Sequence, residues 1–159
     1  EELSRRLSDL KVPVVCANYD FSGTPLENQV KPYVIVRKAG KKIGIIGLLT
    51  DLSSVLSKGI ADSLVYSDPA HAANRYAEYL KNEKGCDMVI CLTHLGIEGE
   101  SYTDEMLVKQ TKDVDLVVGG HSHTLLKSEV YVENSLGRKI PVVTDWKWGL
   151  HIGKMEIDF

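Results

Sequence analysis

The sequence predicts an α+β fold, in which a largely parallel sheet is covered on both faces and continues into antiparallel strands. Short, wholly apolar runs alternate with helical patterns, as buried parallel strands do. The same order of helix, buried strand and histidine occurs twice in the middle of the chain. The last part of the chain carries three strand patterns with no helix between them, which indicates a small meander.

Length and composition fit one globular domain and exclude several classes of protein. The 159 residues are 43% hydrophobic and 26% charged, which is typical of a soluble domain with its own core. The longest apolar run, Ile43–Leu49, is far shorter than the ~20 residues of a membrane-spanning helix. The net charge of −3 is not gathered into a basic stripe, so nucleic acid is not an expected partner. The three cysteines lie in apolar stretches and are expected to be buried thiols.

The first part of the chain predicts a helix, a buried strand and a hairpin. Residues Glu1–Leu10 form the helix, because three leucines recur at spacings of four and three. The valine-rich run Val12–Ala17 is too short for a helix and favours a strand. Two further strands, Tyr33–Arg37 and Lys42–Leu49, flank a short connection of hairpin length.

The clearest helical pattern spans Asp68–Lys84. Pro69 lies just inside its start, and Gly85 follows its end, as a left-handed cap would require. Residues Asp51–Lys58, before it, predict one or two helical turns ended by Gly59.

The rest of the chain predicts two more buried strands around a helix, and then the meander. The strands are Asp87–Thr93 and Asp115–Val118, and the helix between them runs from about Tyr102 to Lys112. The meander strands, with a turn at 134–137, are Val130–Glu133, Ile140–Thr144 and His151–Phe159.

Three histidines stand where a ligand would be expected in such a sheet. His94, His121 and His123 follow the carboxyl ends of two buried strands, and ligands collect at that edge of a parallel sheet. If residues 119–123 are extended, His121 and His123 point to the same side. One histidine would usually be an ordinary polar residue, but a His-x-His pair with a third histidine at a matching strand end favours a metal site. Three neighbouring glycines would let the backbone approach closely: Gly96, Gly119 and Gly120.

The remaining candidates are interpreted as structural, and no nucleophile is indicated. His71 belongs to the predicted helix, and His151 to a predicted strand near two tryptophans. Packing or turn formation is the expected role of a last group: Asn18, Tyr19, Asp20, Asp145, Trp146 and Trp148. The chain has no P-loop, no Gly-x-Ser-x-Gly elbow and no Cys-x-x-Cys pair, so serine or cysteine catalysis has no support.

Five segments together resemble the 5'-nucleotidase and UDP-sugar hydrolase branch of the calcineurin-like metallophosphoesterases. The most specific is Gly-His-Ser-His with the strand before it; the five lie at 14–19, 42–48, 92–96, 119–124 and 148–153. The resemblance implies a four-layer αββα sandwich with two divalent metals, zinc, manganese or similar, that share a bridging water. It places His94 and His121 on one metal and His123 on the other. The implied reaction is attack of a metal-activated water on the phosphate of a nucleotide or nucleotide sugar.

The same resemblance implies that residues 1–159 are the C-terminal part of a catalytic domain, and so a partial domain. The family's upstream Asp-x-His pair, bridging Asp and Gly-Asn-His-Glu segment are not in this sequence. We therefore expect the intact parent to be a two-metal hydrolase, and this chain alone to bind at most one metal weakly and to be nearly inactive. Its expected partner is the missing N-terminal half, or a second copy in a homodimer or strand-swapped dimer. A periplasmic or cell-surface location is expected from the resemblance alone.

Other functions remain open from the sequence. One is a different enzyme of the superfamily, such as a 2',3'-cyclic nucleotide phosphodiesterase or a sulfur-compound hydrolase. Another is a noncatalytic subunit that keeps the fold for binding. A metallo-β-lactamase-like site also uses His-x-His, but the Asp-His pair that should follow His123 is missing.

Overall fold

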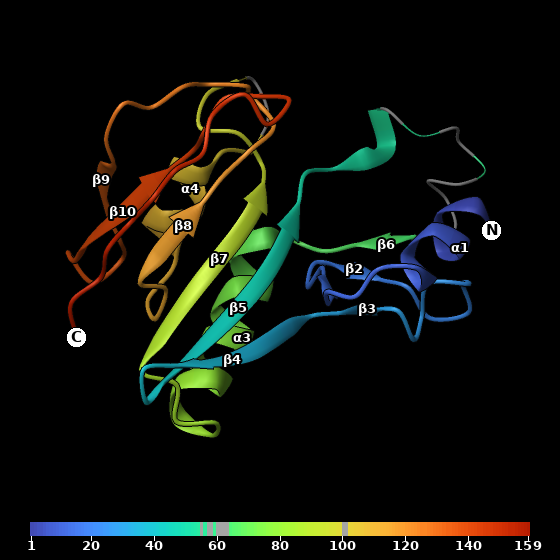
Figure 1. The fold of residues 1–159 in the computed structure, drawn as a ribbon, viewed down its shortest axis with the longest axis horizontal. Coiled ribbons are helices and arrows are strands. Elements are labelled where there is room, and N and C mark those ends of the chain that lie inside the picture. The colour runs from blue at the N-terminus through green and yellow to red at the C-terminus, as the bar shows by residue number, and fades with distance from the viewer. Residues whose placement is uncertain (55, 57–58, 60–63, 100–101) are drawn as a thin grey trace.

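The computed structural model describes residues 1–159 except 55, 57–58, 60–63 and 100–101, and a six-stranded mixed sheet forms its centre (Figure 1). The four inner strands are parallel, and the two edge strands are antiparallel to their neighbours. This arrangement confirms the α+β class. The strands follow in the order β4 (Tyr33–Lys38), β5 (Lys41–Leu49), β7 (Met88–His94), β8 (Leu116–Val118), β10 (Lys139–Val143) and β9 (Val130–Glu133).

Two small two-stranded sheets accompany the main one. β1 (Val14–Val15) pairs in parallel with β3 (Val30–Lys31). β2 (Tyr19–Asp20) pairs in an antiparallel manner with β6 (Val65–Tyr66). In Figure 1 they lie beside the short N-terminal helix α1 (Glu2–Ser8), away from β8 to β10.

Helices α3 (Pro69–Asn82) and α4 (Asp104–Gln110) both cover one face of the sheet, behind it in Figure 1. A Cβ at Gly44 of β5 would lie 2.8 Å from Leu80 Cδ1 of α3, so Gly44 faces that helix. Gly44 is level with Val89 of β7, and Thr93, four residues on, therefore faces the same way. Thr93 donates a hydrogen bond to Asp104 of α4. Both helices therefore lie on the same face of the sheet.

Connection handedness explains why both helices lie on one face. The strands β5, β7 and β8 follow one another in space in chain order, with α3 between β5 and β7 and α4 between β7 and β8. Parallel crossovers are right-handed in nearly all proteins, so successive crossovers in one direction place their helices on the same face. Helices on both faces would require the strand order to reverse, which it does not do here.

The opposite face is covered only in part by described residues. A Cβ at Gly47 of β5 would overlap the carbonyl group of Val15, so the β1 backbone lies directly on the sheet there. The Gly47 carbonyl accepts a 2.8 Å hydrogen bond from Ala17 N–H. Farther along, Leu92 of β7 is 48% exposed. This face therefore leaves apolar surface in contact with solvent.

The end signals of α3 are confirmed. Asp68 is the N-cap, and its carboxylate accepts a 2.8 Å hydrogen bond from His71 N–H. Pro69 is the first helical residue, where a missing N–H has no cost. After the helix, Gly85 has φ of 62°, and Cys86 N–H donates to the Leu80 carbonyl.

The predicted hairpin is confirmed, with its turn at Ala39 and Gly40. Both residues have positive φ, 49° and 78°, which matches the twist of the two flanking strands. Thr103 caps α4, and the turn at 134–137 joins β9 to β10 as expected. The three cysteines are free and buried, as predicted. Of residues 51–58, the described part forms a single 3₁₀ turn at Leu52–Ser54, and residues 55 and 57–58 lie outside the described residues.

The predicted strand His151–Phe159 is wrong. These residues form no regular secondary structure, and their apolar side chains Ile157 and Phe159 lie near Met88 and Leu116 at the starts of β7 and β8. The segment therefore contacts the sheet without strand pairing, and its residues stay exposed. Within the described ranges, no helix combines the length and the apolar composition that crossing a bilayer requires.

Gly47→Ala should lower the free energy of unfolding by about 3 kcal/mol, because the added methyl group meets the rigid backbone of β1. Gly44→Ala is the matched control on the same strand, where the methyl group meets only the flexible end of Leu80 and should cost about 1 kcal/mol. Urea denaturation measures both. Equal losses for the two variants would contradict the direct packing of β1 on β5.

Candidate metal centre

His94 is the last residue of β7, and the neighbouring strand β5 fixes its height at the sheet edge. Leu49 of β5 is level with His94, and Thr50 N–H donates a 3.2 Å hydrogen bond to the His94 carbonyl. Asn18, which is fully buried, fixes Leu49 in turn through two hydrogen bonds of 2.7 and 2.9 Å to its backbone. Asn18 therefore has the structural role that the sequence indicated.

The imidazole rings of His94 and His121 lie together, with centroids 4.9 Å apart and an edge-to-face angle of 64°. The parallel register causes this contact. Leu92 of β7 is level with Val118 of β8, so both histidines leave the sheet at the same edge. The structure thus joins two predicted site residues that are far apart in the sequence.

The extended conformation assumed for residues 119–123 is wrong. His121 and His123 have φ of 85° and 55°, so the backbone turns at both residues. Non-glycine residues rarely adopt positive φ, and such local strain is commonly found at functional sites. Side-chain alternation therefore does not place His123 beside His121.

Glycines bring the two loops close together. A Cβ at Gly120 would lie 3.3 Å from His94 Nδ1, and one at Gly96 would lie 3.5 Å from His121 Cδ2. Gly96 also has φ of 92°, which other residues rarely adopt. At these two positions the backbone of one loop lies directly against the histidine of the other.

Hydroxyl groups tie the two loops together. Ile97 N–H donates a 3.2 Å hydrogen bond to Ser122 Oγ, which lies 2.9 Å from Thr124 Oγ1. Thr124 Oγ1 donates a 2.8 Å bond to the Glu98 carboxylate. The loop after β7 and the His-Ser-His-Thr loop are therefore held as one unit around the two imidazoles.

The surroundings of His94 favour its neutral form. Its pKa is lowered from the ordinary value by partial desolvation, and further by the nearby positive charge that His121 and His123 acquire when protonated. Metals bind neutral imidazole, because the protonated ring has no free lone pair. The loops therefore keep a metal-binding form of His94 available at lower pH than a free histidine would.

These residues fit one part of a metal site. His94 and His121 are adjacent imidazoles, and the Gly120 backbone makes room for the His94 ring. In the described part of the chain, however, no group of three or more His, Cys, Asp or Glu side chains is placed to hold a metal ion. The three-histidine site of His94, His121 and His123 therefore stays a prediction.

The weaker candidates lie elsewhere. His71 is exposed on α3, and its backbone N–H completes the helix cap. The His151 ring packs 5.5 Å from Trp146, in agreement with the packing role expected for it. Asp145 lies against Gly153, because a Cβ added at Gly153 would overlap the Asp145 carboxylate.

Sequence reasoning missed one residue next to the histidine loops. Asp104 is fully buried, and its burial raises the pKa of the carboxyl group to about 6. In the sequence it is one acidic residue in the first turn of a helix, a position that is usually exposed. Only the spacing between α4 and β7 shows that it is enclosed.

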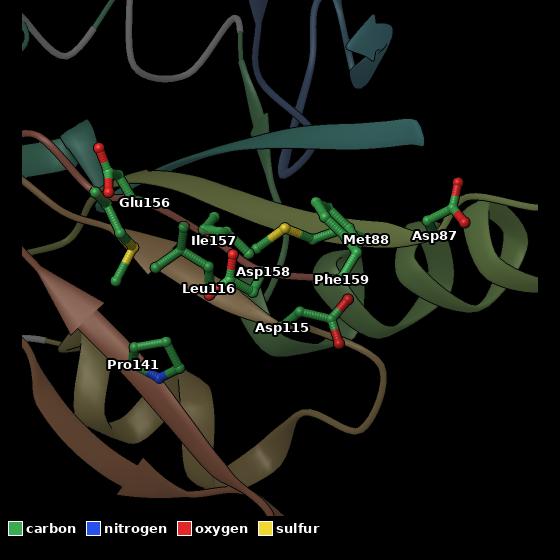
Figure 2. A pocket seen from close by; sticks show the side chains of 10 residues that line it. Asp87, Met88, Asp115, Leu116, Pro141, Glu156, Ile157, Asp158 and Phe159 are labelled. Atoms are coloured by element: carbon green, nitrogen blue, oxygen red, sulfur yellow. The ribbon is translucent and has the colours of Figure 1, made fainter. Parts of the chain in front are cut away.

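A pocket at the other end of the sheet is separate from the histidines (Figure 2). Met88 and Leu116 line it and begin their strands, whereas His94 ends β7. Figure 2 shows the labelled C-terminal residues Ile157 and Phe159 over these two side chains. This pocket is formed by the C-terminal segment on the sheet, and no predicted site residue lines it.

The known proteins that this chain resembles are phosphoesterases and nucleotidases. The family model described as calcineurin-like phosphoesterase matches residues 1–125. The chain is 29% identical to the 5'-nucleotidase of Rattus norvegicus over 96% of its own length and 28% of that protein. It superposes on the structure of a 5'-nucleotidase precursor from Thermus thermophilus with a TM-score of 0.82 at 34% identity, covering 92% of this chain and 30% of that one.

A second solved structure is the NAD nucleotidase of Haemophilus influenzae, with a TM-score of 0.75 and 28% identity. The match covers 91% of this chain and 27% of that one. The chain therefore spans less than a third of each of these relatives.

Replacing His121 with alanine should raise the pKa of His94, because it removes a neighbouring positive charge that opposes protonation. The pKa should remain below that of a free histidine, since desolvation is the larger cause. NMR titration of the His94 ring measures the change. His71→Ala, on exposed α3, is the control and should leave it unaltered; an unaltered value in His121→Ala would contradict the contact.

Proposed function

Because the chain belongs to the calcineurin-like phosphoesterase family, we propose that it is part of a metal-dependent phosphohydrolase that acts on nucleotides. The observation that carries this proposal is the His94–His121 contact at the carboxyl edge of the sheet. The nucleotidases among its relatives support a 5'-nucleotide or a nucleotide sugar as the substrate. A periplasmic or cell-surface location belongs to the same proposal and is supported by the family resemblance alone.

We assign the metal ligands of this chain to its three site histidines. His94 and His121 would hold one divalent metal, and His123 a second one. When bound, such metals act as Lewis acids that activate water and stabilise the charge developing on a phosphate. The donor set supports this assignment, because imidazole nitrogen suits zinc, and a lowered pKa favours the neutral, metal-binding form of His94.

The chain's own residues orient these donors. Strands β7 and β8 hold the two loops at one height, and the bonds of Ser122 and Thr124 hold the loops to each other. The orientation of ligands by such outer contacts commonly decides metal affinity. The Gly120 backbone leaves the space beside His94 Nδ1 free of a side chain.

Residues 1–159 are, in this proposal, the C-terminal part of a catalytic domain. Three neutral imidazoles bring no negative charge, and two dications at short distance repel each other strongly unless a carboxylate lies between them. In the described part of the chain, no group of three or more potential ligands is arranged to hold a metal ion, and the Glu98 carboxylate of these loops accepts a hydrogen bond from Thr124. The missing N-terminal half would supply the carboxylates and cover the sheet face on which Leu92 is exposed.

The full-length protein should release phosphate from a nucleoside monophosphate in the presence of zinc or manganese. His94→Ala and His121→Ala should each lower kcat/KM at least about 100-fold, because each removes a ligand that positions a metal. A phosphate-release assay measures this. His71→Ala is the matched control and should retain wild-type activity. Full activity in both site variants would refute the assignment.

The isolated chain 1–159 should bind at most one zinc ion weakly and show little hydrolysis, because its described residues arrange no group of three or more ligands for a metal ion. Isothermal titration with zinc and the same phosphate assay test this. Robust turnover by the purified chain, as a monomer or a homodimer, would show that the upstream part is dispensable.

A further inference from the structure

Asp104 is a carboxylic acid enclosed in the protein without an obvious reason. It has no exposed surface, and its Oδ1 accepts a 2.6 Å hydrogen bond from Thr93 Oγ1. Its Oδ2 is buried and has no hydrogen-bond partner among the described residues. Burying a carboxyl oxygen without a partner costs free energy, so a structural or functional cause is expected.

Asp104 contacts both chain segments that carry the paired histidines. Its hydrogen-bond donor Thr93 directly precedes His94. A Cβ at Gly119, two residues before His121, would overlap Asp104 Oδ2. Its own backbone N–H donates a 2.8 Å bond to the carbonyl of Gly96, in the loop after His94. One side chain thus joins the ends of β7 and β8.

Helix capping does not account for this arrangement. Thr103 already caps α4, since its hydroxyl accepts the Met106 N–H. The acidic residue next to Asp104, Glu105, is exposed and pairs with Lys109 at 2.6 Å, which shows that a first-turn acid here needs no burial. The enclosure of Asp104 is therefore specific to its contacts with the sheet.

Asp104 acts from the side of the sheet opposite to the His94 ring. Thr93 faces the helices, and side chains alternate along a strand, so His94 points to the other face. Asp104 therefore cannot reach a metal held by that ring and can act only through the backbone.

We propose that Asp104 is a positioning residue, which fixes the separation of His94 and His121 by bonding Thr93 and packing its second oxygen on Gly119. The consequence for metal binding rests on the proposed function, whereas the consequence for the ring separation does not. A distortion of the two strand ends would move both imidazoles, because both histidines leave the sheet at these ends.

The test uses two removals and one conservative variant in the full-length protein. Thr93→Val removes the hydroxyl donor at nearly constant volume, and Asp104→Asn replaces a charged acceptor with an amide whose N–H group has no acceptor at Gly119. Both should weaken zinc affinity at least about 10-fold. Thr93→Ser keeps the hydroxyl and should retain the wild-type affinity. Zinc affinity is measured by competition with a chelator.

Glu105→Gln is the matched control on the same helix, because it removes an exposed charge without touching the sheet. It should leave zinc affinity unchanged. Circular dichroism and the thermal midpoint identify any variant that fails to fold. If Thr93→Val does not fold, the zinc affinities of Thr93→Ser and Asp104→Asn decide whether the proposal holds. Wild-type zinc affinity in a folded Asp104→Asn variant would overturn the proposal, as would an equal loss in Thr93→Ser and Thr93→Val.

A second measurement separates this proposal from the proposed function. The nuclear Overhauser effect between the His94 and His121 ring protons reports their separation without any metal. It should weaken in Thr93→Val and Asp104→Asn and persist in Thr93→Ser and Glu105→Gln. If the wild-type protein neither binds zinc nor hydrolyses nucleotides, the proposed function fails, and this ring contact alone decides the role of Asp104. An unchanged contact in both removal variants would overturn it.

Discussion

The parallel register of β7 with β8 is the constraint on which the site depends. Leu92 lies level with Val118, so His94 and Gly120, each two residues farther on, reach the same height at the sheet edge. Because Gly120 has no side chain, the His94 ring can occupy the space beside it, and His121 follows at a ring distance of 4.9 Å. A register shift of one residue would turn His94 to the helical face. The pairing of β7 with β8 therefore determines which side chains meet at this edge of the sheet.

Features that local physical chemistry determines could be predicted from the sequence. Pro69 and Gly85 bracket α3, and the apolar runs of β5 and β7 could only be buried strands. The meeting of His94 and His121 followed from a general property of parallel sheets, that their carboxyl ends share one edge. These inferences needed only neighbouring residues or the direction of the strands.

Features that depend on long-range packing could not be predicted in this way. The placement of both helices on one face follows from strand order, which the apolar pattern does not contain. The segment His151–Phe159 has a strand pattern but packs on the sheet as irregular chain. The positive φ of His121 is set by the loop contacts of Ser122, and the burial of Asp104 by the distance between α4 and β7. Propensity is a weak guide wherever tertiary contacts decide.

Charge is divided between the two faces of the sheet. At the edge that carries the imidazoles, the Glu98 carboxylate accepts a hydrogen bond from Thr124, and the described residues arrange no group of three or more potential ligands for a metal ion. The buried acid nearest in structure to the histidine segments, Asp104, is bonded to Thr93 on the helical face. Since the sheet backbone separates Asp104 from the His94 ring, its charge cannot bridge two cations beside that ring. Under the proposed function, a carboxylate that bridges two cations would have to lie on the face on which Leu92 is exposed, because the His94 ring points to that face.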